Sequence, residues 1–184
     1  ISRYNPVFDS VEQKGYWRLE PLIRYKFFPK KSTHIISHGP QVYLDRYTDK
    51  DYKLTDNQLA FSYQAQFKNT SELKLSYRQW FTHLYFDTDV TFTDTTAISV
   101  GDYKYNNMRI DYTTNPRKKL NGEVTSIFGE YYSGYRNNLK LGLNYRMQPW
   151  GTFGLSYNYN SIKMPKFKEA VDISLIGASA ELSF

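Results

Sequence analysis

Cysteine is absent from the 184-residue chain, and so is any long apolar run. Without cysteine, disulfides cannot hold the fold together and no thiol chemistry is available. No stretch approaches the roughly 18 consecutive apolar residues that a membrane-spanning helix needs, and the mean hydropathy is -0.65. Any segment of this chain that crosses a membrane must therefore be a strand.

Recognisable catalytic motifs are missing as well. The sequence has no nucleophile elbow, phosphate-binding loop, HExxH pair or dinucleotide fingerprint. The net charge is +6, yet basic residues cluster only at 30–31 and 117–119, both in expected turns. Because nucleic-acid binding needs a contiguous basic face, no nucleic-acid partner is expected. We also expect no cofactor, and no residue points to catalysis.

Aromatic residues are abundant instead, with 18 tyrosines and 12 phenylalanines. Both types favour a pleated, half-exposed surface, which predicts β structure. Apolar and polar residues alternate strictly over 139–148, 153–160 and 58–67, and with one interruption over 17–27. A period of two places alternate residues on opposite faces of a strand. Each of these segments is therefore expected to be a strand with one apolar and one polar face.

Nine strands are predicted in all, the other five lying at roughly 33–47, 71–86, 106–115, 120–132 and 169–184. Pro21 interrupts the first strand, because proline removes a donor from the hydrogen-bond ladder, and a bulge or an edge position is expected there. In 71–86 and in 169–184 the apolar set changes sides part-way along the strand. This change of phase predicts a β-bulge in each.

The connections between these strands alternate in length. Short connections rich in turn formers are expected around 28–32, 68–71, 115–119 and 148–151, and longer ones at 47–57, 87–105, 132–137 and 162–169. Short turns at one end and long loops at the other are typical of outer-membrane barrels. The predicted fold is therefore all-β, an antiparallel transmembrane β-barrel of outer-membrane type, with 1–184 forming one barrel segment.

The number of strands bears on closure of this barrel. With nine strands, the first and the last run in the same direction and cannot pair in an antiparallel ladder. Unless residues 1–13 supply an extra strand, we therefore expect a part of a larger barrel, completed by flanking sequence or by another chain. A closed barrel of about eight strands is the alternative at this length.

Turn and aromatic patterns follow one another in a fixed order after residue 28: FPKKS at 28–32, GP at 39–40, LYFD at 84–87, GDY at 101–103, NPRKK at 115–119, GEYYSG at 129–134, YR at 145–146, QP at 148–149 and MP at 164–165. In these patterns the chain resembles the C-terminal region of an uncharacterised family of Bacteroidota-type outer-membrane proteins. In that family a family 9 carbohydrate-binding-like module precedes a large barrel. The resemblance implies a barrel that continues past residue 184 and a possible glycan ligand.

Polar residues on the inward face of such a barrel would line its lumen. There they would tune selectivity or satisfy one another through hydrogen bonds. The candidates are Gln64, Arg109, Asp111, Lys140, Asn144 and Arg146.

Aromatic residues supply a second set of candidates. Trp17, Trp80 and Trp150 are expected in the interfacial aromatic girdle of the barrel rather than in sugar-stacking platforms. Tyrosines in exposed loops are better candidates for stacking against a ligand, namely Tyr103, Tyr105, Tyr131, Tyr132 and Tyr135.

Metal sites are not predicted. Asp87, Asp89 and Asp94 offer oxygen ligands for calcium, but their spacing does not match an EF-hand, and solubilising a loop is the simpler role. The histidines at 34, 38 and 83 are expected to be solvated or hydrogen-bonded rather than bound to a metal.

The leading hypothesis is an outer-membrane protein that acts as an envelope scaffold or passes solutes. Its partners would be outer-membrane lipid, together with other envelope subunits or a glycan. Two alternatives stay open: a soluble barrel that binds a ligand inside, and the barrel part of a carbohydrate-active surface enzyme. A soluble barrel buries Leu139, Leu141 and Leu143, whereas a membrane barrel turns them outward.

Overall fold

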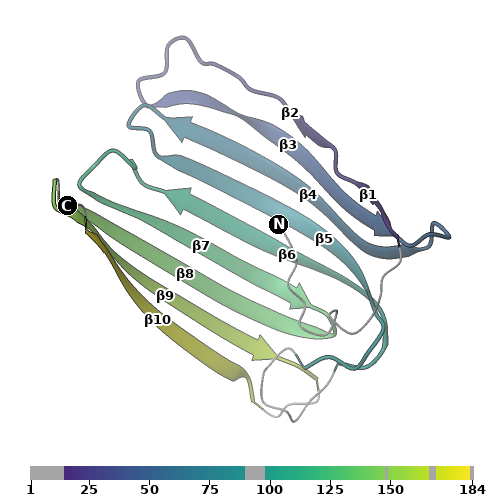
Figure 1. Ribbon diagram of the computed structural model, residues 1–184. Coiled ribbons are helices and arrows are strands. Elements are labelled where there is room, and N and C mark those ends of the chain that lie inside the picture. The colour runs from purple at the N-terminus through teal and green to yellow at the C-terminus, as the bar shows by residue number, and fades with distance from the viewer. Residues whose placement is uncertain (1–14, 90–97, 148, 166–168, 183–184) are drawn as a thin grey trace.

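A computed structural model describes residues 15–89, 98–147, 149–165 and 169–182 (Figure 1). All regular secondary structure in these ranges is β-strand. The strands are β1 (Trp17–Leu19), β2 (Leu22–Arg24), β3 (Ile35–Thr48), β4 (Leu54–Phe67), β5 (Glu72–Leu84), β6 (Gly101–Thr113), β7 (Leu120–Tyr131), β8 (Gly134–Met147), β9 (Gly151–Lys163) and β10 (Val171–Leu182). The described residues include no helix with the length and apolar character to span a membrane.

The ten strands form one antiparallel sheet in the order β1-β3-β4-β5-β6-β7-β8-β9-β10, with β2 also paired to β3. Among the described residues, each strand contacts only the strands to which it is hydrogen-bonded. The sheet is therefore a single layer. Figure 1 shows this layer as a curved sheet, with β1 and β2 along one edge and β10 along the other, so that the sheet is not closed.

Strand pairing lines up the alternating residues on two continuous faces. Ser62 lies opposite Gln41 on one side and opposite Ser76 on the other, so all three share one face. On the other face, Phe61 lies between Val42 and Tyr77 in the same way. The alternation seen in the sequence thus becomes one polar and one apolar face across the middle of the sheet.

Burial is reversed relative to the usual pattern of soluble proteins, in which apolar residues are inside. Ser62 and Ser76 are 7% and 6% exposed, whereas Phe61 and Met108 on the opposite face are 47% and 48% exposed. Side chains on a curved single layer crowd together on its concave side and spread apart on its convex side. The polar residues therefore form the concave face, and the apolar residues form the convex face.

Pro21 divides the first strand as the sequence predicts. β1 ends at Leu19 and β2 begins at Leu22, and both pair with β3 at the edge of the sheet. The Pro21 carbonyl still accepts a hydrogen bond from the Leu44 amide at 3.1 Å. The interruption therefore removes a donor at this edge without detaching the strand from β3.

The bulges predicted in 71–86 and 169–184 are wrong. β5 pairs with both neighbours, and β10 with β9, without a shift of register. Trp80 and Leu84 consequently lie on the concave face, which becomes apolar where Leu84 packs with Ile98, Ile162 and Met164. The change of phase in β5 reflects this change in the composition of the concave face. The bulges in the sheet lie instead in the β3–β4 pairing, at 35–37 and 47–48.

The connections at the two ends of the sheet differ less in length than the sequence predicts. At the Leu84 end, the connections are 49–53, 85–100, 132–133 and 164–170. At the opposite end, called here the Phe67 end, they are 25–34, 68–71, 114–119 and 148–150. The long loop expected at 132–137 is wrong, because the chain reverses in two residues and β8 begins at Gly134. The longest connection, 85–100, does lie at the Leu84 end.

Both edge strands run in the same direction, as the strand count predicts. Every pairing in the sheet is antiparallel, and β1 and β2 together occupy one position in a series of nine. Direct pairing of β1 and β2 with β10 would therefore be parallel, and this sheet cannot close on itself as an antiparallel barrel.

Candidate binding surface on the concave face

Hydrogen bonds between neighbouring strands connect the polar side chains of the concave face. Ser62 Oγ donates to Ser76 Oγ at 3.0 Å, between β4 and β5. Near the β10 edge, Asn138 Nδ2 donates to Asn158 Oδ1 at 2.8 Å. Because these residues lie directly across a ladder or one step along it, the β pairing itself brings them into hydrogen-bonding range.

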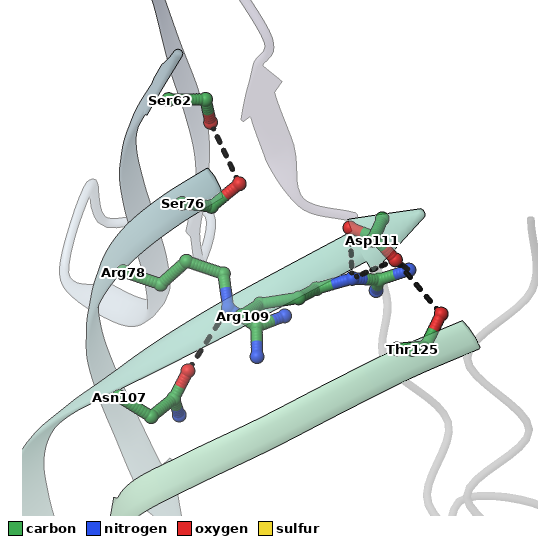
Figure 2. A network of polar contacts seen from close by, with 7 residues as sticks. All are labelled: Ser62, Ser76, Arg78, Asn107, Arg109, Asp111 and Thr125. Carbon is green, nitrogen blue, oxygen red and sulfur yellow. Dashed lines mark hydrogen bonds and ion pairs between the residues drawn. The ribbon is translucent and has the colours of Figure 1, made fainter. Parts of the chain in front are cut away.

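Arg109 is neutralised within its own strand (Figure 2). Its Nε and Nη2 donate to the Asp111 carboxylate at 2.6 to 2.8 Å, and Thr125 Oγ1 on β7 donates to the same carboxylate at 2.8 Å. Residues two apart in a strand share a face, so the alternation places this pair side by side. The result is a paired charge on a water-accessible part of the concave face.

Arg78 lies beside this pair and is 9% exposed. Its Nε donates to the amide oxygen of Asn107 at 2.9 Å, across the β5–β6 ladder (Figure 2). Its guanidinium also lies 5.6 Å from the centre of the Trp80 ring, a cation–π distance. The charge of Arg78 is thus held by a neutral amide and a ring rather than by a carboxylate.

Aromatic rings gather where β5, β6 and β7 meet at the Leu84 end. Trp80 and Tyr105 stack nearly parallel, with ring centres 6.1 Å apart. Tyr105 also contacts Tyr131 edge-on and Tyr132 at a tilt, at 6.0 and 5.2 Å. Tyr103 contacts Tyr132 edge-on at 5.4 Å. These five rings are called the aromatic cluster below.

A cavity of about 230 Å³ opens between the arginines and the aromatic cluster. It is lined by Arg78, Trp80, Tyr105, Asn107, Ile127, Glu130, Tyr131 and Arg136. The cavity thus combines two cationic side chains, an amide and three aromatic rings. Ligand sites typically combine apolar walls with a few polar groups in this way.

All six predicted lumen residues lie on the concave face. Gln64 pairs with Lys74, Arg109 with Ser76, and Asp111 with Thr125. In β8, the residues Lys140, Asn144 and Arg146 lie in alternate positions with Asn138. The six do not converge on one point, since they extend from β4 to β8 and from one end of the sheet to the other.

Four of the five predicted ligand-stacking tyrosines belong to the aromatic cluster, but the expectation that they are exposed loop residues is wrong for Tyr103, Tyr105 and Tyr131. Tyr103 and Tyr105 are in β6, Tyr131 ends β7, and Tyr105 is only 6% exposed. Tyr135 is 62% exposed and pairs with Glu130 on the convex side of the sheet, away from the cluster.

The predicted girdle position of Trp80 is also wrong, because Trp80 lies on the concave face in the aromatic cluster. Trp17 and Trp150 are 60% and 65% exposed, at opposite ends of the sheet. Trp17 stacks on Tyr52, with ring centres 5.9 Å apart.

The acidic and histidine candidates do not assemble into a metal site within the described residues, where no group of three potential ligands comes together. The Asp87 carboxylate accepts a hydrogen bond from the Val100 amide at 3.0 Å, across the 85–100 connection. Asp94 lies outside the described residues. His38 Nδ1 contacts the Tyr63 hydroxyl, and His83 pairs with Asp102.

Sequence reasoning missed the two arginines of the cavity. Arg78 lies in the half of β5 where a bulge was predicted, although an unbroken alternation from Leu75 and Tyr77 would have placed it on the polar face. Arg136 lies in the predicted loop 132–137, which the structure shows to be the start of β8.

Comparisons of the chain with protein-family models, curated proteins and solved structures found no match. The resemblance to the outer-membrane family therefore stays a prediction.

Proposed function

We propose that this sheet is part of the wall of an outer-membrane β-barrel, with its convex face against lipid and its concave face lining a water-filled interior. The protein would serve as an envelope scaffold or pass polar solutes. The observation that carries this proposal is the reversed burial of the two faces. A water-soluble sheet would leave its polar residues in solvent, whereas here the polar residues crowd the inside of the curve.

The apolar side chains of the convex face form a band with a defined edge. Toward the Leu84 end, the convex face changes from apolar to polar on each of seven neighbouring strands. The polar residues at this edge are Arg46, Asn57, Gln79, Asn106, Glu130, Asn137 and Ser161. Two residues depart from the pattern, since Ser126 lies within the apolar run of β7 and Phe81 lies beyond Gln79 on β5. Several of the edge residues are direct neighbours, since Gln79 pairs with Asn106 and Asn137 pairs with Ser161. Such an aligned edge is expected where a membrane surface crosses a barrel.

The height of this band suits a membrane. In β8, the convex-facing run from Leu139 to Met147 extends about 27 Å at the usual rise per residue. With the tilt of about 35–45° found in membrane barrels, this length spans roughly 20 Å across the bilayer, close to the usual apolar band of about 25 Å.

Aromatic side chains mark the band at the Phe67 end. Tyr63, Tyr112, Tyr145 and Phe153 all lie on the convex face near this end and are 37% to 46% exposed. Trp150, in the connection between β8 and β9, adds a further exposed ring. Amphipathic aromatic rings are enriched at the level of lipid headgroups, which accounts for their position here.

Partitioning of the intact protein tests this proposal. We expect the folded protein to require detergent or lipid, and to stay with vesicles after a wash at high salt and high pH. A protein that folds and stays monodisperse in buffer without detergent would contradict it, and would favour a soluble protein with its apolar face covered.

A further inference from the structure

We propose that the cavity between Arg78, Arg136 and the aromatic cluster binds a small organic anion with one planar ring, its carboxylate held by the two guanidinium groups. This inference deepens the proposed function, because it names the class of solute that the concave face would hold. The arginine and aromatic contacts that support it lie on that face.

The buried charge of Arg78 favours an anionic ligand. Among the ion pairs of the described residues, Arg18 pairs with Asp45 and Glu20, and Arg109 pairs with Asp111. Arg78 is more buried than either, yet within the same residues the only hydrogen bond of its side chain is to the neutral Asn107 amide. Burying a cation without an anion is costly, so an anionic ligand would be favoured at this position.

Arg136 provides a second cationic group of the same kind. Its Nε donates to Asn160 Oδ1 at 2.7 Å, and its guanidinium lies 5.0 Å from the centre of the Tyr131 ring. Within the described residues Arg136 has no carboxylate partner. Since Nε is used in both arginines, the terminal amino groups remain to bind a carboxylate, a geometry in which guanidinium groups bind strongly.

Glu130 is the one acidic residue among those that border the cavity, but its position in β7, paired with Tyr135, directs its side chain to the convex face. Its carboxylate accepts hydrogen bonds from the Asn106 backbone and side-chain amides at 2.8 and 3.3 Å. This carboxylate is therefore engaged by the neighbouring strand rather than by either arginine, and the cavity keeps its positive character.

The size and walls of the cavity limit the rest of the ligand. Its volume of about 230 Å³ lies below the roughly 300–1,000 Å³ of sites for drug-sized molecules, which points to a ligand of a single ring. Trp80, Tyr105 and Tyr131 supply aromatic walls against which a planar ring can pack.

Benzoate and benzamide are suitable probes, because they share a ring and a shape but differ in charge. Titration of the intact folded protein, followed by tryptophan fluorescence and calorimetry, should show saturable binding of benzoate at least tenfold tighter than benzamide. Equal affinities, or no saturable binding of benzoate, would overturn the proposal.

Variants identify the site. Arg136→Gln and Arg78→Gln should each weaken benzoate binding at least tenfold, whereas Arg146→Gln, at the far end of the same face, should leave it within twofold. Far-UV circular dichroism checks that each variant is folded. If Arg78→Gln loses β structure, Arg136→Gln alone tests the site. Unchanged binding in Arg136→Gln, or equal weakening in Arg146→Gln, would overturn the proposal.

The titration also separates this inference from the proposed function. It can be run in detergent or in buffer, whichever keeps the protein folded. A protein that is soluble without detergent would contradict the lipid-facing convex face without affecting the benzoate result.

Discussion

Individual side chains on this sheet differ in environment according to the face of the strand on which they lie, even when they are close in sequence. Leu141 is 39% exposed on the convex face, whereas Asn138, three residues earlier on the concave face, is 3% exposed. The apolar residue is thus the more exposed of the two. In water such an arrangement would leave the apolar residue without the stabilisation of burial. In a membrane barrel, the apolar residue faces hydrocarbon and the polar residue faces the water-filled interior.

Arginine substitutions on the two faces of β8 should therefore differ in their effect. Leu141→Arg places a charge in the apolar band, and should lower the free energy of unfolding in lipid vesicles by about 2–4 kcal/mol. Asn144→Arg, on the concave face of the same strand, should change it by less than about 1 kcal/mol. Denaturant titration of both variants in vesicles measures the difference, and equal destabilisation would argue against a lipid-facing convex surface.

The face of each residue was largely predictable from the sequence. Gln64, Arg109, Asp111, Lys140, Asn144 and Arg146 all share one face of the sheet, because a period of two fixes sidedness wherever the pairing is regular. Contacts across the sheet were not predictable. The meeting of Arg78 with Asn107 depends on the register between β5 and β6, which a single strand's pattern does not contain.

At the scale of the strands and turns, the nine predicted positions all exist, and the main errors lie in the connections. The reversal at 132–133 was missed because Tyr132 takes a positive φ of 52°, a conformation more typical of glycine or asparagine. The two turn residues, Tyr132 and Ser133, are not one of the Asn-Gly, Asp-Gly or Gly-Gly pairs that are typical of two-residue hairpin loops. The strand following it, β8, was consequently predicted to begin several residues too late.

Gly134 is the residue at which this turn is most sensitive to substitution. An added Cβ would lie 2.2 Å from the Lys163 carbonyl oxygen and 2.6 Å from Met164 Sδ, so the backbone of β9 would have to move. Gly134→Ala should lower the free energy of unfolding by about 1–3 kcal/mol, measured by denaturant titration.

Gly177→Ala, on edge strand β10, is the matched control. An added Cβ there comes close only to the hydroxyl of Ser156 on β9. We expect this control to be destabilised by less than about 1 kcal/mol. A larger loss at Gly177 than at Gly134 would mean that the β7–β8 turn does not pack closely on the end of β9.

At the scale of the whole molecule, the sequence predicted an all-β antiparallel sheet whose first and last strands run the same way, and the structure has this arrangement. The curvature of the sheet produces the difference in burial between its two faces, because it crowds Ser62, Ser76 and Arg78 on one side and spreads Phe61 and Met108 on the other. Neither the curvature nor the cavity could be predicted from strand patterns, since both depend on how neighbouring strands coil around one another.

The contact of the convex face with lipid is the central claim, and the absence of native cysteine makes it directly measurable. Single cysteines in β8, at 139, 141, 143 and 145 and at 140, 144 and 146, would carry nitroxide labels in vesicle-bound protein. Relaxation by oxygen should dominate at the odd positions, and relaxation by a water-soluble nickel chelate should dominate at the even ones. Odd positions shielded from both reagents, or reached by the nickel chelate, would contradict the claim.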